Sequence, residues 1–339
     1  MTDLRELTTL RLGGPADRFV RVTTEQELLD VERDLDDDGG WVLLVAGGSN
    51  LVVADDGFRG TALQLDTRGI QAEGDLCGGA YVEVQAGEPW DDLVAHAIEQ
   101  GWSGIEALSG IPGSVGATPI QNVGAYGEEV SEVVARVRCW DRGDLALRTF
   151  TAAECGFGYR TSRFKAEPQR YVVLSVTFQF KLGTLSAPVR YAELARTLGV
   201  ELGGRAPMGD VRAAVLELRR SKGMVLDAAD HDTWSAGSFF TNPFVAQAPD
   251  GAPAYPQPDG TVKTSAAWLI ENAGFAKGYG NERVGLSTKH TLALTNRGTG
   301  STAELLALAE EIQRGVHQRF GIWLVNEPVL VGCSLPDGP

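Results

Sequence analysis

One stretch constrains the fold of this chain more than any other, WVLLVAGGSNLVV at residues 41–53. The apolar run from Trp41 to Ala46 predicts a buried strand, and Gly-Gly-Ser-Asn predicts a tight loop before a second strand-like run. A dinucleotide-binding Rossmann unit needs a helix after its glycine-rich loop, whereas this pattern predicts a strand there. The sequence therefore argues against a Rossmann unit at this position.

The small residues of this loop have two interpretations. Backbone N–H groups without Cβ obstruction can converge on an anion, and the Ser49 and Asn50 side chains would add donors. An ordinary tight turn between strands explains the same residues. Taken alone, the tetrapeptide favours the turn.

Length and charge bound the class of protein. With 339 residues, 43% of them hydrophobic, the chain is long enough for two or three domains. Its net charge of −15 argues against nucleic acid or an anionic membrane as a main partner, since both need basic patches. We expect a small-molecule partner and a monomer.

The cysteines, the histidines and the N-terminus point to a cytoplasmic protein. Cys77, Cys139, Cys155 and Cys333 have no paired spacing, so free thiols in a reducing compartment are expected. The histidines are also far apart, and no metal site is expected. No stretch has the apolar length of a signal peptide or of a membrane span.

The order of predicted elements indicates an α+β protein with a boundary near residues 184–205. Helices are expected at 24–36, 90–100, 210–222, 266–273 and 302–320, and strands at 61–65, 81–87, 134–140, 171–180, 289–296 and 323–332. The second helix would bury Leu93, Val94, Ala97 and Ile98, and the last one Leu305, Leu308, Ala309 and Ile312.

A second glycine-rich segment, SGIPGSVGATPIQNVGAYG at residues 109–127, strengthens the ligand-binding interpretation of the first. It has no steady period, and ordering so many glycines costs backbone entropy. Long ordered loops of this kind are usually functional, although a mobile lid without ligand contacts is the alternative. Two such loops in the N-terminal half suggest a large phosphorylated ligand.

Three side chains are candidates for chemistry. Arg160, beside Tyr159, could bind a carboxylate with two parallel hydrogen bonds, or it could pack its stem on the surface. Glu327 lies between apolar residues and before a proline, where a buried carboxylate could transfer a proton or a strand-end residue could face solvent. Ser238, in SAGSFFTNP, lies directly before two phenylalanines.

Six motifs resemble, in the same order, the UDP-N-acetylenolpyruvoylglucosamine reductase (MurB) family of flavoenzymes. They are AGGSNLVV, SGIPGSVGATPIQNVGAYG, YRTSRFK, AGSFFTNP, AAWLIENAG and NEPVLVG, and the likeness runs from about Thr8 to Gly332. The segment VRYAEL around Tyr191 resembles the type I form, which has a tyrosine-bearing lid.

The resemblance implies three domains. Two would form the FAD-binding fold shared with vanillyl-alcohol-oxidase/PCMH-like flavoproteins, at residues 1–66 and 67–205, with the PCMH-type region at about 13–183. A third, α/β substrate-binding domain would cover 206–325, and a strand and tail would follow at 326–339. FAD would bind at Gly47, Gly48, Ser49, Asn50, Ser109, Gly110, Ile111, Pro112, Gly113, Gly116, Ala117, Gln121, Asn122, Gly124, Ala125, Tyr126 and Gly127.

The resemblance also implies a reaction of peptidoglycan precursor synthesis, and so a role in cell-wall formation. NADPH would reduce FAD, and flavin N5 would then give hydride to UDP-N-acetylglucosamine enolpyruvate, forming UDP-N-acetylmuramate. Arg160 and Glu327 would stabilise the charge that develops, and Ser238 would donate the proton. Phe239 and Phe240 would keep water from that hydroxyl.

The expected substrate contacts are Tyr159, Tyr191, Lys222, Asn242 and His290. Lys222 and Asn242 match diphosphate contacts, and Tyr191 matches the lid residue that covers the diphosphate. Ala117 stands where the family pattern has a glycine.

Two alternatives remain at this point. A flavin oxidase of the same fold would keep both glycine loops but not this set of three side chains. A nucleotide-sugar binding protein without flavin would be colourless.

Overall fold

The computed structural model describes residues 2–38, 40–75 and 79–338. Cys77 lies outside the described residues. The chain forms two compact units, of which unit 1 comprises residues 1–18, 48–59 and 221–339, and unit 2 comprises residues 19–47 and 60–220. Both mix helices and strands, so the α+β class is confirmed. The three-domain division stays a prediction.

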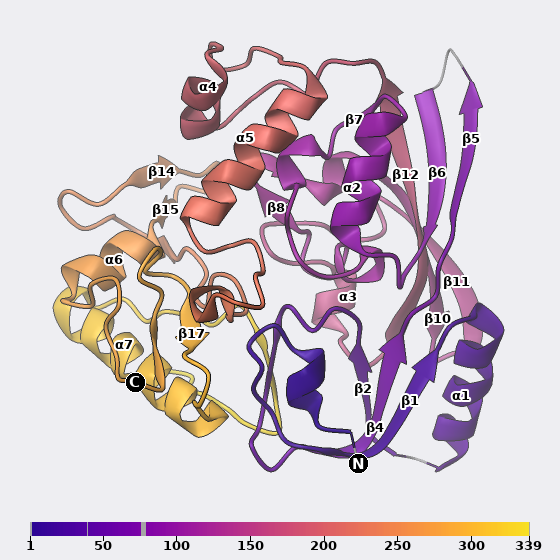
Figure 1. The fold of residues 1–339 in the computed structure, drawn as a ribbon, viewed down its shortest axis with the longest axis horizontal. Coiled ribbons are helices and arrows are strands. Elements are labelled where there is room, and N and C mark those ends of the chain that lie inside the picture. The colour runs from indigo at the N-terminus through magenta and orange to yellow at the C-terminus, as the bar shows by residue number, and fades with distance from the viewer. Residues whose placement is uncertain (1, 39, 76–78, 339) are drawn as a thin grey trace. The chain divides into compact units, whose positions relative to one another are not determined.

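Unit 2 contains the largest sheet, with strand order β11-β10-β12-β6-β5 and β7 paired to β12. A smaller sheet, β1-β4-β2, carries α1 on one face (Figure 1). The strands are β1 Ala16–Val22, β2 Val42–Val45, β4 Phe58–Leu65, β5 Ile70–Asp75, β6 Gly79–Gln85, β7 Trp102–Ser103, β8 Gly124–Ala125, β9 Glu128–Glu129, β10 Val134–Asp141, β11 Ala146–Thr151 and β12 Tyr171–Leu182. The helices are α1 Glu25–Asp38, α2 Trp90–Glu99, α3 Arg163–Ala166, α4 Ala192–Leu198 and α5 Met208–Ser221, with short 3-10 turns η2 Glu106–Leu108, η3 Val115–Ala117 and η4 Val130–Glu132.

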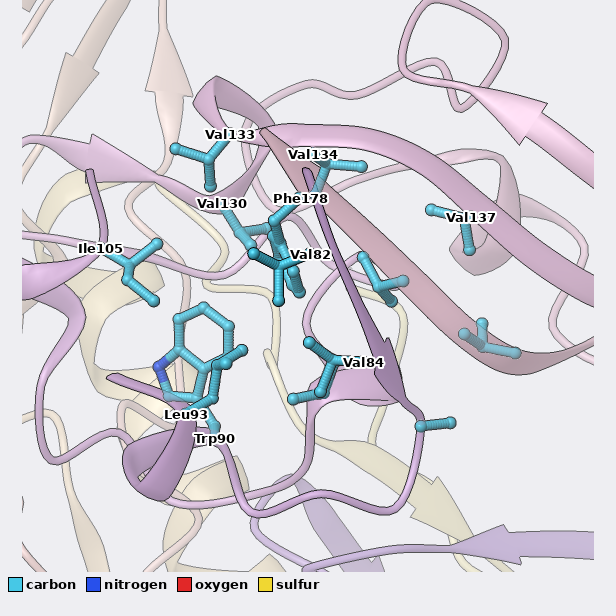
Figure 2. Close-up of a cluster of buried hydrophobic side chains, with 14 of the residues drawn as sticks. Val82, Val84, Trp90, Leu93, Ile105, Val130, Val133, Val134, Val137 and Phe178 are labelled. Atoms are coloured by element: carbon cyan, nitrogen blue, oxygen red, sulfur yellow. The ribbon is translucent and has the colours of Figure 1, made fainter. Parts of the chain in front are cut away.

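The main core of unit 2 forms where α2 packs on this sheet. Figure 2 shows Trp90 and Leu93 of α2 facing Val82 and Val84 of β6, with Phe178 of β12 beside them. All five side chains are buried. The predicted apolar face of this helix is confirmed, because Val94 and Ala97 are also fully buried and Ile98 packs against the cluster.

Unit 1 is built from short strands, two helices and long connections. Its helices are α6 Ala266–Asn272 and α7 Thr302–Phe320, with 3-10 turns η1 Leu4–Leu7 and η5 His231–Thr233. Its strands are β3 Leu51–Val53, β13 Phe244–Val245, β14 Ala254–Pro256, β15 Val262–Thr264, β16 Val284–Leu286, β17 Leu294–Asn296 and β18 Val329–Val331. The predicted buried face of α7 is confirmed, since its core joins α6, Phe239 and Phe240.

The end of the chain pairs with a strand near its beginning. β18 runs parallel to β3, with Val329, Leu330 and Val331 opposite Leu51, Val52 and Val53. Asp55, just after β3, accepts hydrogen bonds from the first backbone N–H groups of α7, at Thr302 (2.8 Å) and Ala303 (2.9 Å). The carboxylate thereby satisfies donors that a helix start leaves open.

Two predicted strands are shorter than expected. Residues 289–293 precede β17 as a turn, and only 329–331 of the predicted strand 323–332 form a ladder. Pro328 has no N–H to donate, so it interrupts regular pairing directly before β18. Trp41 was also predicted within a buried strand, but β2 begins at Val42 and Trp41 is 70% exposed.

Candidate active site

The glycine-rich segment of residues 109–127 is hydrogen-bonded to the start of α2 within unit 2. Trp90 donates its indole N–H to the Leu108 carbonyl and its backbone N–H to the Gly113 carbonyl, each at 3.0 Å. Further along, Val115 donates to Glu88 and Gly116 to Ala86, both at 2.9 Å. The segment is thus an ordered part of the structure with a defined backbone path, not a free lid.

Several predicted flavin-binding glycines have no room for a side chain. A Cβ on Gly47 would lie 2.7 Å from the Cα of Gly113, and one on Gly116 would lie 2.5 Å from the Cβ of Ala86. The close approach of Gly47 to Gly113 brings together the two glycine-rich loops that the sequence suggested for one ligand. A Cβ on Gly48, at φ +56°, would overlap the Leu7 carbonyl.

Ala117 differs from these glycines. It lies in the short 3-10 turn η3 and is not among the residues with positive φ, so its backbone conformation suits alanine. Replacement of the family's glycine is therefore tolerated at this position by the local backbone. Its effect on FAD binding stays a prediction.

Among the described residues, five other than glycine have left-handed backbone, of which two lie in this segment and a third, Arg160, is hydrogen-bonded to it. Asn122, Tyr126 and Arg160 have φ values of 48°, 50° and 52°. Each such conformation costs on the order of 1 kcal/mol and persists only where the surroundings impose it. At Asn122 the surroundings include three hydrogen bonds to its buried side chain. It donates to Glu129 (2.7 Å) and Gly158 (3.1 Å) and accepts from Ser131 (3.1 Å).

Arg160 is fixed to the same segment. Its Nη2 donates to the Gly124 carbonyl at 2.7 Å, and its guanidinium carbon lies 5.4 Å from the centre of the Tyr159 ring. Lys165 donates to the Arg160 backbone carbonyl at 2.9 Å. Since the side chain is part-buried and anchored at one edge, it is held in place and not spread on the surface.

Tyr191, the predicted lid residue, contacts the end of the glycine-rich segment. Its ring meets that of Tyr126 edge to face at 5.4 Å between centroids. The neighbouring Arg190 forms an ion pair with Glu132 at 2.7 Å. Tyr191 is 42% exposed, so the contact leaves much of its ring open to solvent.

A buried pair of acids near this segment escaped the sequence analysis. Glu128 is 5% exposed, and burial together with the charge of Glu106 raises its pKa to about 8. Glu106, fully buried, accepts backbone N–H bonds from Gly104 (2.7 Å) and Ile105 (3.1 Å). Nothing in the local sequence distinguishes them from surface glutamates, because their burial arises from chain packing.

In unit 1, the segment carrying Ser238 is fixed on both sides. Phe239 donates to the Leu292 carbonyl at 2.7 Å and accepts from the Glu327 N–H at 2.8 Å. The Phe239 and Phe240 rings are 1% exposed and meet edge to face. Gly237 has φ +73° with open space where a Cβ would be, so the turn's conformation requires the glycine. The part-buried Ser238 is thereby set on an apolar base.

Ser238 and Glu327 come from distant parts of the sequence and are brought together in unit 1. The bond from the Glu327 N–H to Phe239 and a bridge between Phe240 and Asn326 align the two segments. The predicted flavin-loop residue Asn50 is linked to the same place, since Val329 donates to its carbonyl at 2.9 Å.

Among the predicted substrate residues in unit 1, His290 feels the positive charge of two lysines, Lys222 and Lys277. Burial, together with the charges of Lys222 and Lys277, lowers the pKa of His290 to about 4. A neutral imidazole within the electrostatic influence of two lysines suits an anionic ligand such as a diphosphate. Lys277 was missed in the sequence analysis. The Asn242 side-chain oxygen accepts from the Ala266 N–H at 2.9 Å, at the start of α6.

The predicted residues are divided between the two units. Unit 1 holds Gly48, Ser49, Asn50, Lys222, Ser238, Asn242, His290 and Glu327, and unit 2 holds Gly47, the residues from Ser109 to Gly127, Tyr159, Arg160 and Tyr191. A cavity of about 560 Å³ in unit 1, lined by Arg5, Arg11, Trp234 and neighbouring residues, includes none of them. Within the described ranges, no cluster of three His, Cys, Asp or Glu could hold a metal ion, and no helix could span a membrane.

Two family models match the chain. The model for an FAD binding domain covers residues 16–148, and that for the UDP-N-acetylenolpyruvoylglucosamine reductase C-terminal domain covers residues 228–331. The first includes all the predicted flavin residues, and the second includes Ser238 and Glu327. Gly47 and Gly113 approach each other without side chains, so the two glycine-rich loops bring bare backbone together, which suits an anionic cofactor.

Curated relatives span the whole chain. A UDP-N-acetylenolpyruvoylglucosamine reductase of Cutibacterium acnes is 60% identical and covers 98% of this chain and 90% of its own. One of Thermobifida fusca is 56% identical and covers 98% and 97%. Among solved structures, UDP-N-acetylenolpyruvylglucosamine reductase (MurB) from Thermus caldophilus matches 97% of each chain, with a TM-score of 0.67 and 25% identity. These likenesses confirm the expected FAD-binding α+β fold, and the chain belongs to the UDP-N-acetylenolpyruvoylglucosamine reductase family.

Proposed function

We propose that this protein catalyses the FAD-dependent reduction of UDP-N-acetylglucosamine enolpyruvate to UDP-N-acetylmuramate, with NADPH as the reductant. The observation that carries the proposal is the 60% sequence identity between this protein and a reductase, over 98% of the chain. The local structure supports it, because Ser238 and Glu327 lie on adjoining segments above a buried aromatic base.

When bound, FAD would supply hydride chemistry, accepting hydride from NADPH and giving it to the methylene carbon of the enolpyruvyl group. The chain's own residues would manage the charge and the proton. In the proposal the Ser238 hydroxyl protonates the neighbouring carbon, so that one hydride and one proton complete the reduction. A serine is a weak acid, and a water-poor pocket with charged neighbours is needed for it to deliver a proton.

Arg160 and Glu327 have the complementary task in this proposal. Negative charge develops on the substrate carboxylate as hydride arrives, and a guanidinium held in advance stabilises it without reorganisation. The bond from Arg160 to the Gly124 carbonyl supports such a role, since it fixes one edge of the guanidinium. The meeting of Arg160 with Ser238 and Glu327 stays a prediction.

The remaining assignments follow the same proposal. Glycine-rich residues from both loops would hold the flavin, and Lys222, Asn242 and His290 would contact the substrate diphosphate. Tyr159 and Tyr191 would contact substrate from unit 2. We also infer a cytoplasmic monomer, because the proposed nucleotide substrates are small and soluble and no partner chain is needed in this scheme.

An anaerobic experiment tests the function. Purified protein should be yellow, NADPH should bleach its flavin absorbance, and UDP-N-acetylglucosamine enolpyruvate should restore the colour quickly. A control uses UDP-N-acetylglucosamine, which lacks the double bond and should leave the flavin bleached. A colourless protein would contradict flavin binding, and fast recovery with oxygen alone would indicate an oxidase.

A further inference from the structure

We propose that Asp91 and Arg212 are positioning residues that set the backbone of the flavin loop at Gly110. The inference rests on the proposed function and concerns two side chains outside the predicted site. The Gly110 N–H donates to Asp91 Oδ1 at 2.6 Å. Arg212 donates to the same carboxylate through Nη1 (2.6 Å to Oδ1) and Nη2 (2.9 Å to Oδ2).

The geometry of the pair explains how it can fix a loop. Two parallel hydrogen bonds from a guanidinium hold a carboxylate in one plane, which also fixes the direction in which Oδ1 accepts a third bond. That third bond comes from Gly110, whose φ of 70° is open mainly to glycine. The Arg212 and Asp91 side chains are 22% and 36% exposed, so solvent screens the pair less than it screens a surface ion pair.

Both side chains stand on helices that already hold the segment. Asp91 is in the first turn of α2, whose Trp90 makes the bonds to Leu108 and Gly113 described above. Arg212 is on α5, and its neighbours Val211 and Val215 pack with Ala107 in one buried cluster. The ion pair therefore connects the two helices at the point where the segment turns.

The charges of this group favour a structural task over proton transfer. Burial opposes ionisation of Asp91, but the bonds from Arg212 and Gly110 and the charge of Arg219 leave its pKa below the usual range. Asp91 is thus a permanent anion at neutral pH. It follows that the Gly110 N–H is committed to Asp91, and that Gly110 contributes the shape of the loop instead of a donor to the flavin.

The test measures FAD binding and backbone exchange in the full chain. Flavin-free protein is titrated with FAD, and hydrogen exchange is followed by mass spectrometry in peptides covering residues 108–116. For Asp91→Ala and Arg212→Gln we expect the dissociation constant for FAD to rise about tenfold, roughly the value of one hydrogen bond to a charged group. Exchange in these peptides should also become faster.

Matched controls are available on the same helices. Asp92 and Arg220 are exposed neighbours, and Asp92→Asn and Arg220→Gln change the net charge by the same amounts. Both should bind FAD as the wild type does. Arg212→Lys keeps the charge without the two-pronged geometry and should give an intermediate affinity, whereas a purely electrostatic role would leave it at the wild-type value.

The outcomes separate this inference from the proposed function. If variants with wild-type melting temperatures bind FAD and exchange like the controls, the positioning role is wrong, whatever the reductase assay shows. If the wild type binds FAD, the variants bind it more weakly, and no enolpyruvyl substrate is reduced, the positioning role holds and the proposed function fails. Should Asp91→Ala not fold, Arg212→Gln and Arg212→Lys decide the matter.

Discussion

The two segments that the proposal places in one reaction are built in opposite ways. In the proposal, residues 109–127 of unit 2 act through their backbone, and their glycines are packed so closely that a Cβ on Gly116 would lie 2.5 Å from Ala86. Residues 235–241 of unit 1 would instead act through a side chain, that of Ser238, and the space where Gly237 would carry a Cβ is open. We therefore expect substitutions that add atoms to damage residues 109–127, and substitutions that remove atoms to damage residues 235–241.

The difference shows which interactions fix the conformation of each segment. The first is ordered by hydrogen bonds to α2 and to residues 86–88, and by left-handed residues that these bonds hold in place. The second is ordered by two buried phenylalanine rings beneath a short run of backbone bonds. The first should fail gradually as its shape changes, while the second should fail abruptly when one hydroxyl is removed.

Removal of that hydroxyl should have the largest effect. Ser238→Ala is expected to slow reduction of the enolpyruvyl substrate by roughly 10²–10⁴-fold, the usual contribution of a positioned proton donor. Bleaching by NADPH should stay near the wild-type rate, since it requires no proton from this residue. Stopped-flow absorbance measures both half-reactions, and Thr241→Ala removes a nearby hydroxyl as a control. Equal damage to both half-reactions would show a structural serine.

Adjacent residues of the other segment provide the matched test of backbone shape. Gly116→Ala places a methyl group against Ala86, and we expect a loss of about 2 kcal/mol in folding free energy together with weaker FAD binding. Ala117→Gly, one residue later, should cost less than about 1 kcal/mol, because that backbone suits either residue. Thermal unfolding measures the stability of the two variants, and titration with FAD measures their affinity for the cofactor. Equal effects at both positions would contradict the steric account.

The buried acid of unit 2 predicts a stability that falls as pH rises. The folded-state pKa of Glu128, about 8, exceeds its ordinary value of 4.5, so the folded chain holds this proton more tightly. Its contribution is fully present below pH 4.5 and is lost as the pH approaches 8. Glu128→Gln should therefore stabilise the fold by up to about 5 kcal/mol at pH 9 and by little at pH 5. Glu99→Gln, at an exposed position of α2, is the control in denaturant unfolding.

His290 of unit 1 predicts the opposite slope and a smaller effect. Its folded-state pKa, about 4, lies below the ordinary 6.5, so its contribution is present above pH 6.5 and is lost as the pH falls through 4. In an NMR titration its resonance, identified by its loss in His290→Gln, should shift near pH 4. If the diphosphate contact is right, UDP should raise this pKa by about one unit through the added negative charge. An unchanged titration with saturating UDP would remove His290 from the site.

Much of the fold followed from local patterns in the sequence. The apolar spacing of α2 and α7 identified the buried faces, because a helix shows its core side every three to four residues. The strands β10 and β12 were also found, since β10 intersperses apolar residues with arginines and β12 begins with an apolar run. Residues 323–327 were misjudged as strand, because apolar composition alone does not reveal that Pro328 interrupts the ladder.

The candidate site was predictable only in part. Ordered motifs pointed to Ser238, Arg160 and Glu327, whose roles stay predictions. Asp91, Glu106 and Lys277 were not found, because each depends on a partner far away in sequence: Asp91 and Arg212 are 121 residues apart. Such pairs carry no local signature and become visible only once the backbone is folded.

The parallel pairing of β18 with β3 has a consequence for the order of events during synthesis. Asn50 and Glu327 are 277 residues apart, yet the strand that follows the first glycine-rich loop finds its partner only in the last part of the chain. Contacts of such long range form slowly and late. On the ribosome, residues 51–53 therefore stay without this partner until residues 329–331 have been synthesised.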